Sequence, residues 1–210
     1  MAWSVCSGRS RRWHRGQARR ADRARRPHHP VTAMRVGFTK LHGLGNDFLV
    51  VDTRALAADV AATLQDPATV RWLCDRQFGV GGDGVLALSA PRTTGAVATM
   101  RVLNADGSEA EMCGNGIRCV AKFLRDRDPA LGDRLVIDTG AGPLACGVAL
   151  AADGTVAAVT VAMGRPRLTR GEVPATGPAD ERWIDGAIAI PGDPAGERRL
   201  TAVSMGNPHA

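Results

Sequence analysis

The chain has no long apolar run and few cysteines, and these absences exclude several classes of protein. No stretch approaches the roughly 18 apolar residues that a membrane-spanning helix needs, so we expect no membrane span. The five cysteines are an odd number and irregularly spaced, without a secretory signal, which argues against a disulfide framework and favours a cytoplasmic protein. Cys113 and Cys119 are too far apart for a zinc knuckle, and we expect no metal site.

The net charge of +6 comes from one end of the chain. Residues 1–33 contain nine arginines and one acidic residue, whereas residues 34–210 hold 18 basic and 20 acidic side chains. Such an arm could bind nucleic acid through phosphate contacts, but no aromatic platform accompanies it, so nucleic-acid binding is the less favoured interpretation. Because residues 1–33 lack apolar periodicity, we expect a disordered extension. We favour Met34 as the true start, with a functional basic arm as the alternative.

Hydrophobic periodicity from Met34 onwards predicts an α+β protein. Apolar positions recur at helical spacing in residues 66–78 and 114–125. Residues 40–47 are rich in turn formers, and Asp153-Gly154 predicts a hairpin turn. Strands are predicted over residues 35–38, 48–52, 85–88, 99–103, 135–138, 144–150, 155–163 and 200–204. Two helices among many strands indicate an α+β fold rather than a doubly wound sheet.

The densest group of polar and glycine residues runs from Asn104 to Cys119. Within it, Cys113 comes directly before the second predicted helix. Free N–H groups and the positive end of the helix dipole stabilise a thiolate at such a position. They can also hold a carboxylate or a developing oxyanion. A cysteine before a glycine-rich turn is nevertheless more often structural than catalytic, so this motif alone does not decide the function.

Three asparagine-centred loops accompany Cys113, and they contain Asn46, Asn104 and Asn207. Asparagine in a turn usually serves the backbone, because it tolerates left-handed conformations and caps neighbouring N–H groups. Three such loops in one nearly neutral chain suggest a polar site without establishing it.

Four motifs in residues 34–210 strongly resemble the diaminopimelate epimerase family, and they occur in the same order as in that family. They are KLHGLGNDF (40–48), GVGGDG (79–84), the segment 104–119 and SMGNPH (204–209). The resemblance implies two pseudo-symmetric halves, each a mostly antiparallel sheet wrapped around a central helix. Residues 34–162 would form the first domain and residues 163–210 the beginning of an incomplete second domain.

The resemblance also implies a mechanism that uses no cofactor. Two cysteines face opposite sides of the substrate α-carbon; one removes the proton and the other returns one, which converts L,L-diaminopimelate into meso-diaminopimelate for lysine and peptidoglycan precursors. Cys113 corresponds to one of the pair. The family's second Cys-Gly motif does not occur after it, so we expect a fragment that is inactive by itself and belongs to a homodimer when full length.

By the same resemblance, the substrate diaminopimelate would be held by side-chain amides and by backbone N–H groups. The substrate-binding residues would be Asn46, Asn104, Gly114, Asn115 and Asn207. His209 would lie beside the site and modulate it.

Relatives of the same fold leave an alternative open. Proline racemase-like enzymes and other isomerases often carry histidine where Asn115 stands, so Asn115 and the following Arg118-Cys119 favour diaminopimelate. Cys119 lies six residues beyond Cys113, and we interpret it as a core residue. Gly84 stands where some relatives place a glutamine that touches the substrate.

Overall fold

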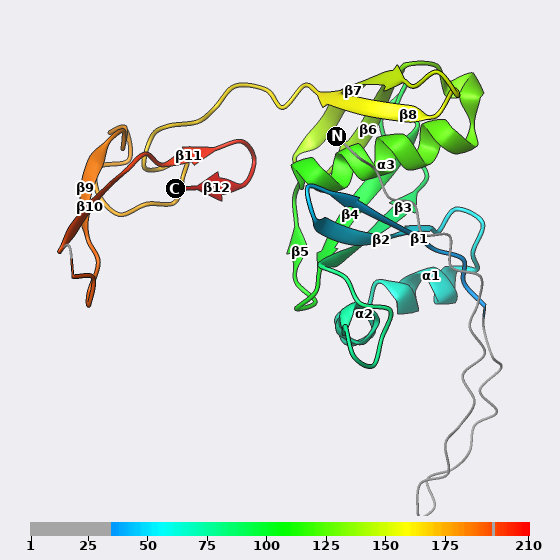
Figure 1. Ribbon diagram of the computed structural model, residues 1–210, viewed down its shortest axis with the longest axis horizontal. Helices are drawn as coiled ribbons and strands as arrows, with labels where there is room; N and C mark the ends of the chain where they lie inside the picture. Colours follow the sequence, from blue (N-terminus) through cyan, green and yellow to red (C-terminus); the bar gives the residue numbers. More distant parts are fainter. Residues whose placement is uncertain (1–34, 195) are drawn as a thin grey trace, which may run out of the picture.

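One mixed sheet of eight strands dominates the structure, a computed structural model that describes residues 35–194 and 196–210 (Figure 1). The arginine-rich extension, residues 1–33, lies outside the described residues. The strand order is β1-β2-β3-β4-β6-β7-β8, with β5 paired to β4. The strands are β1 (Thr39–Gly43), β2 (Asn46–Asp52), β3 (Gly84–Ser89), β4 (Ala98–Asn104), β5 (Glu109–Ala110), β6 (Arg134–Thr139), β7 (Gly142–Leu150) and β8 (Val156–Val161). Only β2–β3 and β4–β6 pair in parallel, so the sheet is mostly antiparallel, as predicted.

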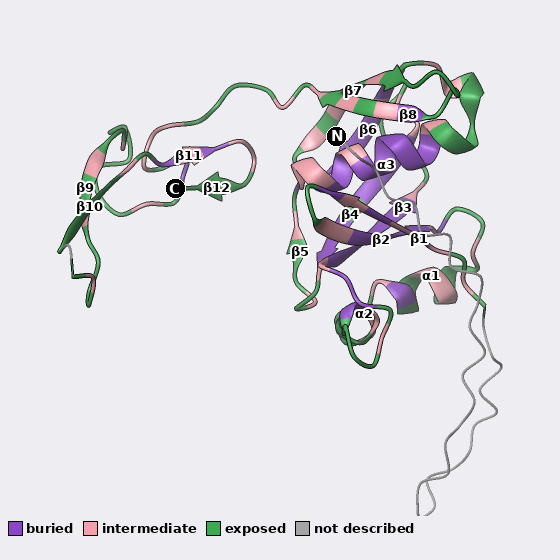
Figure 2. Ribbon diagram, viewed as in Figure 1, coloured by how far each residue is buried: buried purple, intermediate pink, exposed green. Residues whose placement is uncertain are grey.

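The sheet curls around one helix, α3 (Gly114–Arg127), which contacts β1, β2, β4, β6, β7 and β8. The predicted apolar face of this helix is buried (Figure 2). Its members are Ile117, Val120, Ala121 and Leu124. Strand residues with the same alternate spacing, such as Val50 and Leu86, point to the same core. The predicted α+β class and central helix are therefore confirmed.

The opposite face of the sheet is covered by α1 (Ala58–Leu64) and α2 (Pro67–Cys74). The intervening positions of the central strands, such as Leu49 and Val85, are buried there. Because both faces of β3 are covered, its residues form a nearly continuous apolar run.

The helix predicted over residues 66–78 ends earlier, at Cys74. Its start is as expected, since the Asp66 carboxylate accepts hydrogen bonds from the first-turn N–H groups. The carboxylate of Asp75 then accepts from the N–H groups of Gln77 and Phe78, and this local turn competes with further helix. Phe78, which helical spacing placed on the buried face, is 74% exposed.

The predicted strand at residues 35–38 is wrong, and the turn predicted over residues 40–47 is present but much shorter. Residues 35–38 belong to no strand, and β1 and β2 form a hairpin whose two-residue turn is Leu44-Gly45. Both turn residues have positive φ, 57° and 89°, as tight hairpin turns require. Leucine rarely takes that conformation, so the sequence does not show which two residues of the segment form the turn. The turn at Asp153-Gly154 is confirmed, with Gly154 at φ 81°.

Residues 163–210 form two separate two-stranded sheets. One pairs β9 (Gly186–Ala189) with β10 (Glu197–Leu200), and the other pairs β11 (Val203–Ser204) with β12 (Pro208–His209). The single strand predicted over 200–204 is therefore divided between two sheets. A short 3-10 helix, η1 (Pro129–Leu131), follows α3, and no helix among the described residues is long and apolar enough to cross a membrane.

Candidate active site

A cavity of about 560 Å³ lies at the N-terminus of α3. All seven residues predicted for the site line this cavity, together with one arginine and several apolar residues. Its lining consists of Asn46, Asn104, Ala110, Met112, Cys113, Gly114, Asn115, Arg118, Met163, Met205, Asn207 and His209. The volume lies in the range of small-molecule sites. The structure brings the predicted residues together; their individual roles remain predictions.

Strand pairing explains how residues far apart in sequence reach this place. Phe48 pairs with Gly84, and Gly84 pairs with Asn104, so the start of β2 and the end of β4 lie at the same end of the sheet. Asn46 and Asn104 lie at this end, where the chain also enters α3. A Cβ atom on Gly84 would lie 2.6 Å from the Leu103 carbonyl oxygen, so glycine meets a packing requirement here.

Cys113 is the N-cap residue of α3, with extended backbone angles and a half-buried side chain. Its Sγ accepts a hydrogen bond from the Gly116 N–H at 3.4 Å and lies 3.9 Å from Asn46 Oδ1. The N–H groups of Gly114 and Asn115 have no acceptor within the helix, because they belong to its first turn. The sulfur thus sits beside backbone donors that favour negative charge.

Cys113 is the most accessible cysteine of the described residues. Cys74, Cys119 and Cys146 are all buried. Burial raises the pKa of Cys119 to about 12 and that of Cys146 to about 11, and it also raises the pKa of Cys74. The interpretation of Cys119 as a core residue is confirmed, and these three thiols are poor candidates for proton transfer.

Side-chain amides form a chain of hydrogen bonds along one wall of the cavity. Arg118 donates to Asn115 Oδ1, and Asn115 Nδ2 donates to Asn46 Oδ1 at 3.3 Å. Asn46 Nδ2 in turn donates to Asp83 Oδ2 at 2.8 Å. Sequence reasoning did not assign Asp83 or Arg118 to the site, although each lies inside one of the recognised motifs.

Charged residues surround Asp83, the hydrogen-bond partner of Asn46. Arg76 bridges Asp47 and Asp83 at 2.6 and 2.8 Å, and Lys40 lies 3.0 Å from Asp47. Burial raises the pKa of Asp47, but hydrogen bonds from Arg76 and Lys40 outweigh it and hold the pKa well below its ordinary value. The Asp47 backbone N–H also donates to Asp83 at 3.0 Å, which fixes that carboxylate beside Asn46.

The remaining predicted residues differ in how firmly they are held. Asn104 Nδ2 donates to Ser108 Oγ at 2.9 Å, so this amide is anchored within its own turn. Asn207 and His209 are exposed and reach the cavity from the β11–β12 hairpin. Gly206 lies in the turn of that hairpin, and an added Cβ there would lie 3.7 Å from Met112 Cε. The β11–β12 hairpin therefore meets the segment that leads into α3 at this point.

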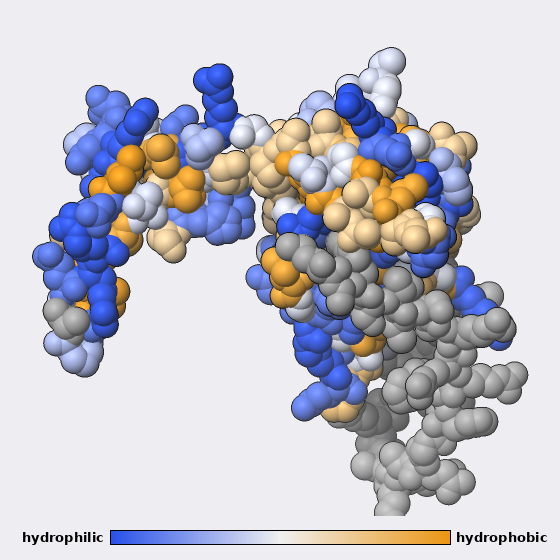
Figure 3. Space-filling view, turned by 45° about the horizontal axis from the view of Figure 1, so that its top comes forward, coloured by the Kyte–Doolittle hydropathy of each residue, from blue (hydrophilic) through white to orange (hydrophobic). Residues whose placement is uncertain are grey.

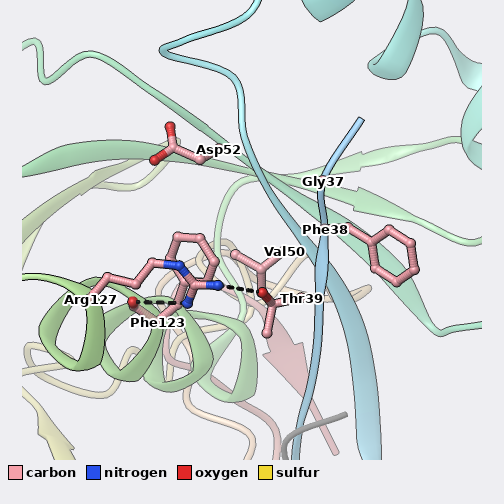
Figure 4. Close-up of a pocket in the computed structure, with 7 residues that line it drawn as sticks. All are labelled: Gly37, Phe38, Thr39, Val50, Asp52, Phe123 and Arg127. Carbon is pink, nitrogen blue, oxygen red and sulfur yellow. Dashed lines mark hydrogen bonds between the residues drawn. The ribbon is translucent and has the colours of Figure 1, made fainter. Parts of the chain in front are cut away.

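A second hollow, of about 260 Å³, lies where the end of α3 meets β1 and β2 (Figure 4). The Arg127 guanidinium stacks on the Phe123 ring at 3.8 Å and donates to Thr39 Oγ1 at 2.7 Å. Asp52 is paired with Arg54 at 2.6 Å, and Phe38 points away from Arg127. The charged groups of this hollow already have partners among neighbouring residues. The contacts of Arg127 fasten α3 to the β1–β2 hairpin.

Comparisons with known proteins agree with the motifs. A family model described as diaminopimelate epimerase matches residues 38–169. Diaminopimelate epimerase of Pelotomaculum thermopropionicum is 46% identical over 174 residues, and that of Synechocystis sp. is 45% identical over 177 residues. These matches cover 82% and 84% of this chain, but 58% and 59% of the relatives, so the chain spans little more than half their length.

Solved structures show the same fold at much lower sequence identity. A probable proline racemase from Agrobacterium radiobacter K84 is 17% identical with a TM-score of 0.56, over 79% of this chain and 48% of that one. A hydroxyproline epimerase from Agrobacterium vitis is 19% identical with a TM-score of 0.55, over the same shares. These two show the fold alone, whereas the family model matches more than half of the sequence. The chain belongs to the diaminopimelate epimerase family.

Proposed function

We propose that this chain supplies one face of the active site of a diaminopimelate epimerase. The observation that carries the proposal is that three of the four sequence motifs line one cavity around the half-buried thiol of Cys113, while the fourth supplies Asp83, which bonds Asn46. The product, meso-diaminopimelate, would serve lysine and peptidoglycan precursor synthesis.

In the proposed reaction, the Cys113 thiolate removes the α-proton of the bound amino acid and becomes a thiol. The electron pair left on the α-carbon spreads into the adjacent carboxylate, whose oxygens are held by the N–H groups of Gly114 and Asn115 at the positive end of α3. In the reverse direction the thiol returns the proton to the same face. No cofactor is needed to carry these electrons.

The opposite face of the α-carbon requires a second acid. The resemblance implies a second cysteine in a Cys-Gly-Ser/Thr-Gly motif, which does not follow Cys113 in this sequence. Among the residues that the structure describes, Cys74, Cys119 and Cys146 do not suit this part because the core surrounds them. We therefore expect the 210-residue chain not to interconvert the isomers unaided, and we expect the complete enzyme to be a homodimer.

The polar lining fits a substrate with amino-acid groups at both ends. The oxygen of Asn46 is an acceptor for an ammonium group near Cys113, and Asn104 and Asn207 offer further amides across the cavity. His209, at the exposed rim, would adjust the local charge. The methionines of the lining suit the methylene chain between the two ends.

The test combines protection of Cys113 with turnover. The 210-residue chain is treated with iodoacetamide, and alkylation of the peptide that contains Cys113 is followed by mass spectrometry with diaminopimelate or proline present. We expect diaminopimelate to slow alkylation and proline not to. The longest protein that the reading frame encodes is then assayed in D₂O for α-proton exchange by NMR, with Cys113→Ser as control.

Exchange of diaminopimelate that requires Cys113 would support the proposal. Protection and exchange with proline instead would assign the proline racemase-like alternative. Exchange that survives Cys113→Ser would remove Cys113 from the mechanism.

A further inference from the structure

We propose that Asp83 is a positioning residue, which fixes the amide of Asn46 so that its carbonyl oxygen, and not its nitrogen, faces Cys113. The effect of this orientation on turnover rests on the proposed function. The orientation itself is a property of the unliganded site.

The polarity of the hydrogen-bond chain determines how each amide is turned. An asparagine side chain has a donor end and an acceptor end, which can exchange by a half-turn about the last bond. The Asp83 carboxylate, paired with Arg76, can only accept, so it requires the nitrogen of Asn46 at 2.8 Å. The oxygen of Asn46 is thereby directed to the other side, toward α3.

The far end of the chain agrees with this direction, through a longer contact to Asn46 than that of Asp83. The Arg118 guanidinium can only donate, so it requires the oxygen of Asn115. The nitrogen of Asn115 must then donate, and the acceptor that it meets is Asn46 Oδ1, at 3.3 Å. A fixed donor at one end and a fixed acceptor at the other leave one consistent arrangement of both amides.

This arrangement gives the sulfur of Cys113 two different neighbours. The Gly116 N–H, at 3.4 Å, is a donor that suits the thiolate. Asn46 Oδ1, at 3.9 Å, is an acceptor toward which the thiol can direct its S–H. Both protonation states therefore have a partner, as a group that alternately removes and returns a proton requires. If the Asn46 amide were reversed, its nitrogen would face Cys113. The sulfur would then have two donors as neighbours, and these favour the thiolate.

The Arg76–Asp83 pair itself contributes little to folding. The two side chains are 57% and 41% exposed, and exposed ion pairs contribute little stability. Replacing Asp83 by asparagine should therefore leave the fold intact while it removes the acceptor-only partner, because a second amide can present either end to Asn46.

The experiment compares Asp83→Asn with Asp47→Asn in the 210-residue chain. Asp47 carries the same charge and bonds the same Arg76, whereas the Asn46 amide nitrogen donates to Asp83. Alkylation of Cys113 by iodoacetamide is measured for each variant at one fixed pH, by mass spectrometry of its peptide. We expect Asp83→Asn to accelerate alkylation about fivefold relative to Asp47→Asn, the ratio that one net hydrogen bond produces.

An exchanged pair provides the rescue. In the double variant Asn46→Asp/Asp83→Asn, the new amide at position 83 can donate to the new carboxylate at position 46, which still presents an oxygen to Cys113. We expect alkylation to fall back to the wild-type rate or below it.

NMR gives a signature of the orientation itself. The nuclear Overhauser effect from the side-chain amide protons of Asn46 to the Cys113 Hβ protons should be stronger in Asp83→Asn than in the wild-type protein, because a reversed amide brings its nitrogen nearer the sulfur.

Equal alkylation rates for Asp83→Asn and Asp47→Asn, together with an unchanged Asn46 amide, would overturn the proposal and leave only an effect of charge. Neither measurement involves diaminopimelate or turnover. A failure of the epimerase assignment would therefore leave this result standing, and the reverse also holds.

Discussion

The large sheet and the segment that follows it are stabilised in different ways. In residues 35–162 both faces of the sheet are covered, and fully buried side chains such as Leu86 and Ile117 fill the core. Among the described residues of 163–210 the buried side chains are Val173, Ala202 and Ser204. Figure 2 shows the second region mostly exposed, and Figure 3 shows largely hydrophilic residues on its visible face.

The second region depends on local polar contacts instead. The Arg170 guanidinium stacks on Trp183 at 4.2 Å and pairs with Glu181 at 3.3 Å, and Arg199 pairs with Asp185 across the β9–β10 ribbon. A two-stranded ribbon buries too little apolar surface to be stable by itself. The candidate site thus has one wall held by a packed core and another held by a lightly packed hairpin.

The largest expected difference between the regions is in hydrogen exchange. The backbone N–H groups of the α3 interior should exchange only on global unfolding, whereas those of β9 and β10 should exchange by local opening. We expect opening free energies that differ by about 5 kcal/mol or more, since the stability of a domain sets the upper limit. Native-state exchange followed by NMR measures this. Similar protection in both regions would show that they unfold as one unit.

Matched isoleucine truncations come next in size. Ile117→Ala removes a side chain with no exposure from the first turn of α3 and should lower the free energy of unfolding by about 2–5 kcal/mol. Ile184→Ala removes one that is 51% exposed and should change it by less than about 0.5 kcal/mol. Urea denaturation followed by circular dichroism compares them. Comparable losses would mean that the second region has a core of its own.

Asp138 and Asp185 compare the contribution to stability of a buried carboxylate in the large sheet with that of an exposed one in the second region. Asp138, 2% exposed in β6, accepts from the N–H groups of Arg92 and Thr93, at 2.7 and 3.0 Å. Asp138→Asn should cost about 1–3 kcal/mol at neutral pH, because a buried acceptor is weakened. Asp185→Asn, at an exposed position, should leave the large sheet unaffected.

The same carboxylate predicts a dependence on pH. A hydrogen bond from the Thr93 side chain outweighs burial and lowers the pKa of Asp138, and the N–H groups of Thr93 and Arg92 lower it further. The stabilisation is therefore fully present above the unfolded pKa of about 3.9 and is lost as the pH falls through the lower folded pKa. Wild-type stability should fall more steeply with acid than that of Asp138→Asn. Parallel curves would contradict this account.

Two turn glycines give the smallest effects. Gly45 and Gly192 both have positive φ, 89° and 82°, with no heavy atom near an added Cβ. Alanine at either site creates the same local strain, about 1 kcal/mol. Gly45→Ala should lower the stability of the large sheet by this amount, because the turn joins β1 and β2. Gly192→Ala should not, and an equal loss in urea denaturation would show that the ribbon is coupled to the sheet.

Where the local signal was strong, the sequence predicted the element. The helix over 114–125 and the strands over 85–88 and 99–103 are present within a few residues of those bounds, because the helix has a periodic apolar face and the strands are short apolar runs. The turn predicted over residues 40–47 is confined to Leu44-Gly45, a limit that the pairing of β1 and β2 sets. Helix α1 was missed because only Leu64 in it is buried.

The family, the central helix and the residue types that line the cavity could all be read from the sequence, since they depend on motifs and on periodicity that are local along the chain. The tertiary structure alone decided which groups surround each of them. The amide of Asn46 is oriented by Asp83, 37 residues further on, and Phe78 is exposed although its helical spacing predicted burial. Side-chain orientation and burial depend on partners from distant segments, and only packing brings those segments together.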